Sequence, residues 1–170
     1  MGMTSFYGPA MDHADAMALL KTVYDEGCRH FDTAEMYTNE DPTIHNEIYL
    51  GGFFQTIQER DSFSVATKFW PTGDCGYDVV KEHLLASLKR LQLDYVDLYY
   101  MHRVKSIEDG VNFVKAAQKL KEEGLINEIG LSEVSGPWLE QITKQSGITI
   151  DAVQQEWSIL TRSLEDDLVP

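Results

Sequence analysis

The sequence predicts an α/β protein with a parallel sheet, because two patterns alternate along its 170 residues. Short apolar runs typical of buried strands are separated by longer segments whose apolar residues recur every three or four positions, as in amphipathic helices. The alternation repeats five times, which is typical of consecutive β-α-β units. Most strand runs are continuously apolar, so we expect helices to cover both faces of the sheet.

Five segments have the length and composition of strands. In chain order they are residues 29–32, 63–68, 95–102, 128–132 and 150–154. The spacing between them predicts helices on four sets of apolar residues: Met17, Leu20 and Tyr24; Leu50, Phe54 and Ile57; Leu84, Leu88 and Leu91; Val111, Val114 and Leu120. The expected helix boundaries are Asp78 and Ser106 as N-caps, Pro137 near a start after Ser135, and Gly27, Gly124 and Gly147 as left-handed C-caps.

Length and composition indicate one folded domain that spans residues 1–170. A chain of this length buries enough surface to have its own core, and its 43% hydrophobic and 25% charged residues are ordinary for globular proteins. No linker rich in proline, glycine or serine interrupts the repeated pattern. The formal net charge of −14 argues against a nucleic-acid partner, although one local phosphate pocket could still bind a dinucleotide.

The two cysteines, Cys28 and Cys75, are far apart and form no CxxC motif, so neither a disulfide framework nor a metal site is expected. No apolar run reaches the roughly 18 residues that a membrane span requires, and the N-terminus has no secretory signal pattern. We therefore expect a protein of the reducing cytoplasm.

Polar side chains end every expected strand. They are Asp32, Lys68, His102, Ser132 with Glu133, and Gln154, while Tyr37 follows in the loop after Asp32. Parallel strands all point the same way, so these side chains should meet at one rim of the sheet, where active sites of such folds lie. A single aspartate or lysine at a strand end is usually a cap or a solvated residue. An acid, a phenol, an ammonium and an imidazole from three successive strands together indicate an active site.

These residues lie within longer motifs. The motifs are residues 30–37 (HFDTAEMY), 66–68 (ATK), 87–91 (SLKRL), 94–103 (DYVDLYYMHR), 123–124 (EG), 129–133 (IGLSE), 152–154 (AVQ) and 156–158 (EWS). In this order they resemble the aldo-keto reductase family. The resemblance implies a partial (β/α)8 TIM barrel with five or six parallel strands, which lacks most of the first strand and everything after the start of the sixth helix.

The resemblance also implies an activity, the NADPH-dependent reduction of aldehydes or ketones, and a role for each candidate residue. Tyr37 would be the general acid, and the Lys68 ammonium would touch its phenol oxygen and lower its pKa from about 10. Asp32 would hold Lys68 in place and keep it charged, and His102 would orient the carbonyl oxygen. Ser132, Glu133 and Gln154 match positions that bind the nicotinamide, and Glu133 stands where many relatives have asparagine. Trp70 and Trp157 would either line an apolar substrate pocket or serve as core or rim residues.

Three interpretations remain open on the sequence. The first is a reductase whose activity requires a completing partner chain or segment. The second is a non-catalytic fragment or interaction subunit, which the short length favours. The third is an unrelated open α/β sheet, which lacks a phosphate-binding motif after its first strand. In each case two open sheet edges favour self-association. The identity of the substrate and the choice between NADPH and NADH stay undetermined.

Overall fold

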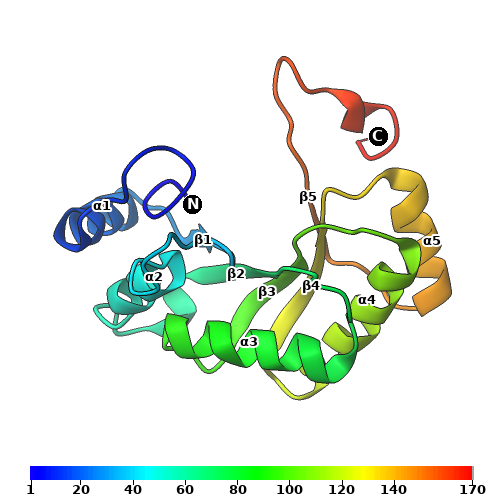
Figure 1. The fold of residues 1–170 in the computed structure, drawn as a ribbon, viewed down its shortest axis with the longest axis horizontal. Coiled ribbons are helices and arrows are strands. Elements are labelled where there is room, and N and C mark those ends of the chain that lie inside the picture. The colour runs from blue at the N-terminus through cyan, green and yellow to red at the C-terminus, as the bar shows by residue number, and fades with distance from the viewer. Residues whose placement is uncertain (170) are drawn as a thin grey trace.

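The computed structural model describes residues 1–169, which form one sheet of five parallel strands in the order β1-β2-β3-β4-β5. The strands are β1 (His30–Asp32), β2 (Ser64–Phe69), β3 (Val96–Met101), β4 (Ile126–Ser132) and β5 (Ala152–Gln154). The sheet curls into half of a barrel whose concave side is open (Figure 1). The predicted α/β class, the parallel sheet and the partial barrel are thus confirmed.

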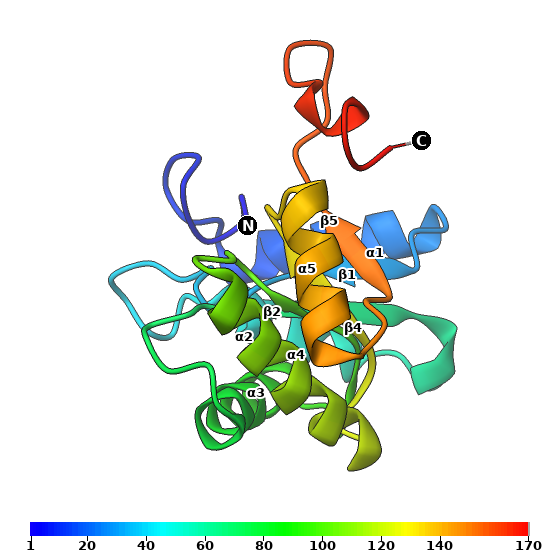
Figure 2. The ribbon, with the colours of Figure 1, turned by 90° about the vertical axis from the view of Figure 1, so that its right-hand side faces the viewer.

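The helices are α1 (His13–Asp25), α2 (Asn46–Phe54), α3 (Tyr77–Leu91), α4 (Ile107–Glu122) and α5 (Gly136–Ser146), with short 3-10 turns η1 (Arg60–Ser62) and η2 (Ser163–Glu165). Helices α2 to α5 follow one another along the convex face of the sheet (Figures 1 and 2). The prediction that helices cover both faces is therefore wrong. In a curled sheet the inner face looks toward the inside of the barrel, so a continuously apolar strand does not require helices on both sides.

Two of the predicted helix boundaries illustrate how local the signals are. The Ser106 hydroxyl accepts a hydrogen bond from the Asp109 amide at 3.0 Å, so Ser106 is the N-cap of α4, as predicted. Asp78 is not a cap, because α3 begins after Gly76 and Asp78 lies in the first turn. There its carboxylate still favours the helix by interacting with the positive end of the helix dipole.

The hydrophobic core lies between the convex face and the helices. Alternate residues of the strands point into it, among them Val65, Phe69, Tyr99, Ile129 and Leu131. The other alternate residues face the concave side, where only a small apolar cluster of Ala66, Leu98 and Tyr100 forms. The concave face thus carries the polar side chains, and the core that stabilises the fold is separate from it.

One close contact between helices allows a test of this packing. Gly51 of α2 lies against the end of α3, and a Cβ atom built on it would be 2.3 Å from the Arg90 carbonyl oxygen. We expect Gly51→Ala to lower the free energy of unfolding by about 1–3 kcal/mol, because backbone cannot yield to relieve the overlap. Urea denaturation followed by circular dichroism measures the change.

The neighbouring Gly52 provides the matched control, because a Cβ atom there would meet only the His13 side chain, at 3.8 Å. Gly52→Ala should leave stability unchanged or raise it, since alanine has the higher helix propensity. Equal stability of the two variants would contradict the close contact between α2 and the end of α3.

The segment after β5 extends away from the sheet (Figure 2). It exposes Trp157, Ile159 and Leu160, the last two almost completely. Within residues 1–169, no helix has the length and apolar character needed to cross a membrane. In the same described part of the chain, no group of three or more potential metal ligands occurs.

Candidate active site

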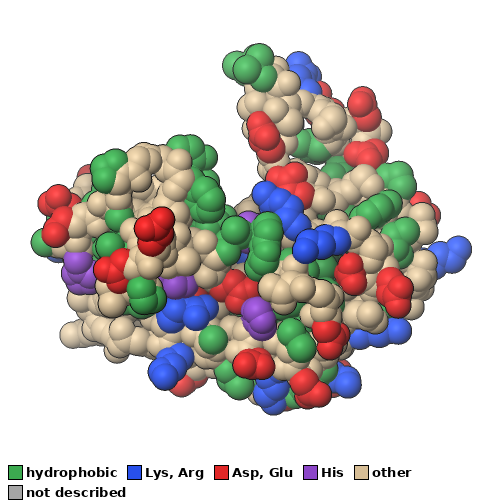
Figure 3. All heavy atoms as spheres, in the orientation of Figure 1, with side chains coloured by type: hydrophobic (Ala, Val, Ile, Leu, Met, Phe, Trp, Pro, Cys, Tyr) green, Lys and Arg blue, Asp and Glu red, His purple; other side chains and the backbone are tan. Residues whose placement is uncertain are grey.

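The carboxyl ends of the strands open into a cavity of about 740 Å³. In the space-filling view the molecule is hollowed above the sheet, between its N-terminal and C-terminal segments (Figure 3). Six of the seven predicted site residues line this cavity: Asp32, Tyr37, His102, Ser132, Glu133 and Gln154. The seventh, Lys68, is fully buried and makes an ion pair with Asp32. The structure therefore brings all seven residues together.

Asp32 connects the two outermost strands of the sheet. Its Oδ1 accepts a hydrogen bond from the Lys68 ammonium, which also donates to the Thr33 carbonyl oxygen at 2.8 Å. Its Oδ2 accepts a hydrogen bond from Gln154 Nε2 at 2.9 Å. Asp32 ends β1 and Gln154 ends β5, so this bond forms only because the sheet curls. The ion pair and the curvature of the sheet are therefore coupled.

Tyr37 lies close to Lys68 but does not form the direct contact that the sequence predicted. The ammonium is 5.3 Å from the centre of the Tyr37 ring, and no hydrogen bond joins it to the phenol oxygen in the described chain. Burial raises the pKa of Tyr37, and the Asp32 carboxylate raises it further. The expected lowering of this pKa is thus not observed. The reason is that burial has the largest effect on this pKa, and the lowering by the Arg103 charge is smaller.

His102 follows β3 and is only 4% exposed. Its ring meets Tyr37 and Trp70 edge-on, with centroid distances of 5.6 and 5.2 Å. Its Nδ1 is enclosed without a partner among residues 1–169, so Nε2 is the nitrogen left to face the cavity. Burial, with the charges of Lys68 and Arg103, lowers the pKa of His102 to about 4. The imidazole is therefore neutral at pH 7 and keeps one N–H group to donate.

The lowered pKa of His102 predicts how stability depends on pH. Below its ordinary pKa of 6.5 and above about 4, the unfolded chain binds a proton that the folded chain excludes. The contribution of His102 to the free energy of unfolding is thus complete above pH 6.5 and is lost as the pH falls toward about 4. His102→Asn should flatten this part of the curve, measured by urea denaturation between the two pH values. Equal slopes in the two proteins would contradict the neutral imidazole.

Ser132 and Glu133 occupy the end of β4 and the first residue beyond it. Ser132 is buried, lines the cavity, and its hydroxyl makes no hydrogen bond to another described residue. Glu133 has a left-handed backbone conformation, with φ of 56°. Asparagine tolerates this conformation better than glutamate does, so the backbone at position 133 is compatible with either residue but favours asparagine.

A buried polar network that the sequence did not indicate supports the cavity from behind. The fully buried Glu47 accepts hydrogen bonds from Thr67 Oγ1 at 2.5 Å and from Arg90 Nε at 2.6 Å. The backbone amide of its neighbour Asn46 donates a hydrogen bond to the Tyr37 carbonyl oxygen at 2.9 Å. Sequence analysis missed Glu47 because an acid in the first turn of a helix is usually an exposed partner of the helix dipole.

Of three further residues near the expected site, one lines the cavity and two do not. His45, in the loop after Tyr37, does not line the cavity. It is buried and caps α2 through a hydrogen bond from the Glu47 backbone amide to Nδ1 at 3.1 Å. Trp70 lines the cavity, with its backbone amide held by the Glu35 carboxylate at 2.5 Å. Trp157 does not line it and is 61% exposed in the C-terminal segment.

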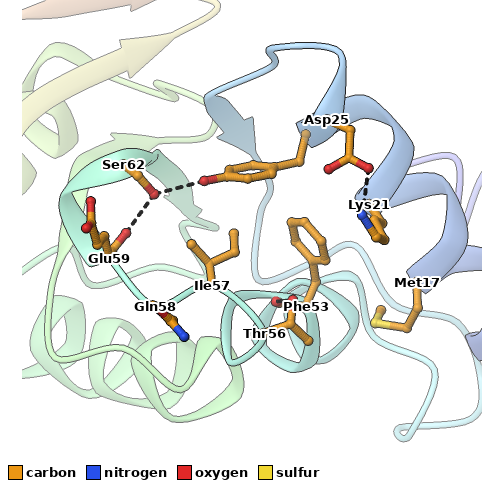
Figure 4. Close-up of a pocket in the computed structure, with 10 residues that line it drawn as sticks. Met17, Lys21, Asp25, Phe53, Thr56, Ile57, Gln58, Glu59 and Ser62 are labelled. Atoms are coloured by element: carbon orange, nitrogen blue, oxygen red, sulfur yellow. Dashed lines mark hydrogen bonds and ion pairs between the residues drawn. The ribbon is translucent and has the colours of Figure 1, made fainter.

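A second cavity, of about 580 Å³, lies between α1, α2 and η1 (Figure 4). Four of its polar side chains form pairs, since the Tyr24 hydroxyl lies 3.0 Å from Ser62 Oγ and Lys21 lies 2.6 Å from Asp25. None of the seven predicted site residues lines it. The chemistry is therefore concentrated at the carboxyl ends of the strands.

Comparisons with known proteins agree with this geometry. The model of the Aldo/keto reductase family matches residues 1–170. A soybean (Glycine max) protein described as probable aldo-keto reductase 1 is 34% identical over 181 residues, and the match covers the whole chain but 49% of that protein. The chain thus spans about half the length of this relative.

Solved structures give the same result. The thermostable aldo-keto reductase Tm1743, determined with the inhibitor epalrestat, superposes with a TM-score of 0.86 at 30% identity, over 99% of this chain and 60% of that one. The aldo-keto reductase of Klebsiella pneumoniae, determined with NADPH, superposes with a TM-score of 0.80 at 26% identity, over 93% of this chain and 53% of that one.

Proposed function

Because the chain belongs to the aldo/keto reductase family, we propose that it is an NADPH-dependent oxidoreductase that reduces aldehydes or ketones to alcohols. One observation carries the proposal: Tyr37 and His102 face a single cavity directly above the ion pair of Lys68 and Asp32. A proton donor, a neutral hydrogen-bond donor and a buried cation are the groups that stabilise a carbonyl oxygen as it gains negative charge.

The residues on the β4 and β5 side of the cavity suit a nicotinamide ring. Its carboxamide both donates and accepts hydrogen bonds, and Ser132 Oγ is free to do either. Gln154 gives its amide group to Asp32, which leaves its carbonyl oxygen as an acceptor. Bound NADPH supplies a hydride to the carbonyl carbon. We propose that Ser132, Glu133 and Gln154 hold the nicotinamide.

The remaining steps belong to the chain's own residues. His102 donates a hydrogen bond from its neutral ring and orients the carbonyl oxygen toward Tyr37. Tyr37 keeps its proton at neutral pH, because burial raises its pKa, and transfers that proton to the oxygen as the hydride arrives. The phenolate that results is stabilised by the Lys68 ammonium, and Asp32 and the Thr33 carbonyl hold this ammonium in place.

Two measurements on the purified chain test the proposal. Titration with NADPH, followed by protein fluorescence, should show saturable binding. Addition of an aromatic aldehyde should then oxidise NADPH, which is followed by absorbance. Saturable binding without turnover would favour the requirement for a completing segment or chain. Absence of both binding and turnover would support the alternative, a non-catalytic fragment or interaction subunit.

The proposal extends to the setting of the protein. We propose that residues 1–170 are one domain, because one sheet runs through the described chain. A cytoplasmic location suits the free thiols of Cys28 and Cys75. The outer edges of β1 and β5 have no strand neighbour among residues 1–169, so we propose that they permit self-association. Size-exclusion chromatography over a range of concentrations tests this point.

A further inference from the structure

Among residues 1–169, Arg103 has the one cationic side chain that lines the cavity containing Tyr37 and His102. Arg103 follows His102 directly and is exposed, and its Nη1 donates a hydrogen bond to the His102 carbonyl oxygen at 2.7 Å. It forms no ion pair with any carboxylate in residues 1–169. A guanidinium has five N–H groups, so most of its donors remain available to a ligand.

The electrostatic influence of Arg103 reaches the groups proposed to act on the carbonyl. Burial raises the pKa of Tyr37 while the Arg103 charge opposes that rise. Burial lowers the pKa of His102, and the Arg103 charge lowers it further. Because Arg103 lines the same cavity as Tyr37 and His102, its guanidinium can contact a substituent of a substrate whose carbonyl lies between those two residues.

The absence of an ion pair at Arg103 is unexpected in this protein. The protein as a whole is acidic, with a formal net charge of −14, so carboxylates able to pair with an arginine are abundant. Within the cavity, Asp32 is occupied by Lys68 and Gln154, while Glu133 and Glu156 follow other strands, β4 and β5. The cationic side chain therefore lies just after β3, directly after the imidazole of His102.

The same wall of the cavity is aromatic. Phe6, Tyr7 and Trp70 line it together with Tyr37, and the Phe6 ring meets the Tyr37 ring edge-on at 6.3 Å. Aromatic walls favour flat apolar groups, and a guanidinium matches the planar geometry of a carboxylate with two parallel hydrogen bonds. A ring that carries both a carbonyl and a carboxylate satisfies both features.

We infer that Arg103 binds a carboxylate on the substrate, so that the proposed reductase prefers aromatic aldehydes or ketones that carry a carboxylate group. The inference rests on the proposed function, since the carbonyl must lie against Tyr37 and His102. It makes Arg103 a residue that determines specificity and takes no part in the transfer of hydride or proton.

A matched pair of substrates tests the inference. 4-Carboxybenzaldehyde and methyl 4-formylbenzoate share the ring and the aldehyde and differ in the charge of one group. Arg103→Gln should raise KM for the acid by about tenfold or more, with kcat little changed, and should leave KM for the ester unchanged. Arg103→Lys should restore part of the loss, and high salt should weaken the preference for the acid.

A binding measurement separates failure of this inference from failure of the proposed function. Benzoate binding can be measured without turnover, from the change in tryptophan fluorescence. The signal is assigned to Trp70 if Trp70→Phe does not show it. Benzoate that binds to the wild-type chain but not to Arg103→Gln supports the carboxylate site even if no aldehyde is reduced. Equal reduction of acid and ester in both proteins would retain the reductase and overturn the carboxylate site, and absence of turnover and of benzoate binding would overturn both. A higher Kd for NADPH in Arg103→Gln than in the wild-type chain would also overturn the carboxylate site, because Arg103 would then bind the cofactor.

Discussion

Replacement of Tyr37 by phenylalanine is expected to lower kcat for carbonyl reduction by at least about 100-fold, the usual contribution of a general acid. The hydroxyl faces the cavity, and burial keeps its pKa above the ordinary value, so at neutral pH it is a proton donor. Phenylalanine preserves the ring that packs against His102 and removes only the proton. NADPH oxidation measures the rate, and fluorescence titration should show unchanged affinity for NADPH.

The control for this experiment is Tyr95→Phe. Tyr95 lies outside the cavity, and within residues 1–169 its hydroxyl forms one hydrogen bond, to Asp61 at 3.4 Å. This variant should reduce aldehydes at the wild-type rate. If Tyr37→Phe retained most of the activity, the proton would have to come from another group. His102 is poorly suited to that role, because its lowered pKa leaves it neutral at the pH of the assay.

The second large effect is expected on stability. Arg90→Met should lower the free energy of unfolding by roughly 3–5 kcal/mol, since it leaves the Glu47 carboxylate buried without its cation. The Glu47 side chain is fully buried and that of Arg90 is 25% exposed, which places the effect toward the lower end of this range. Methionine preserves the apolar stem of the side chain, so the loss reports on charge. Urea denaturation at neutral pH measures it.

Two further variants separate this charge effect from simpler causes. Lys89→Met removes an exposed cation from the same last turn of α3 and should change stability by less than about 0.5 kcal/mol. Glu47→Gln combined with Arg90→Met should recover part of the loss, because the buried charge is then absent. If the double variant were no more stable than Arg90→Met alone, the loss would reflect packing and the buried carboxylate would be protonated or solvated.

The positions of the candidate residues could be predicted because they depend on topology. Asp32, Lys68, Ser132 and Gln154 lie at the ends of their strands and His102 just beyond one, and parallel strands bring such positions to one rim whatever the details of packing. The same argument predicts that the site lies at the rim formed by the carboxyl ends of the strands. The helix positions followed similarly, because hydrophobic periodicity is a local property.

Contacts between side chains could not be predicted in this way. The sequence suggested that Lys68 pairs with Asp32 and touches the phenol of Tyr37. The ammonium does pair with Asp32, but it lies 5.3 Å from the ring centre and forms no hydrogen bond with the phenol in residues 1–169. Burial raises the pKa of Tyr37, in the direction opposite to the one expected. Periodicity and motif order carry no information on burial at this scale, and burial is the larger influence on this phenol.

The amino-acid sequence by itself determined the order of strands and helices, the parallel sheet and the rim at which polar side chains collect. Each of these follows from the spacing of residues along the chain. Only the tertiary structure decided that the sheet curls far enough for Gln154 to bond Asp32, that Glu47 is buried against Arg90, and that Arg103 lines the cavity without an ion pair to any carboxylate in residues 1–169. These depend on distances between residues remote in sequence, and such distances are set by packing of the whole chain.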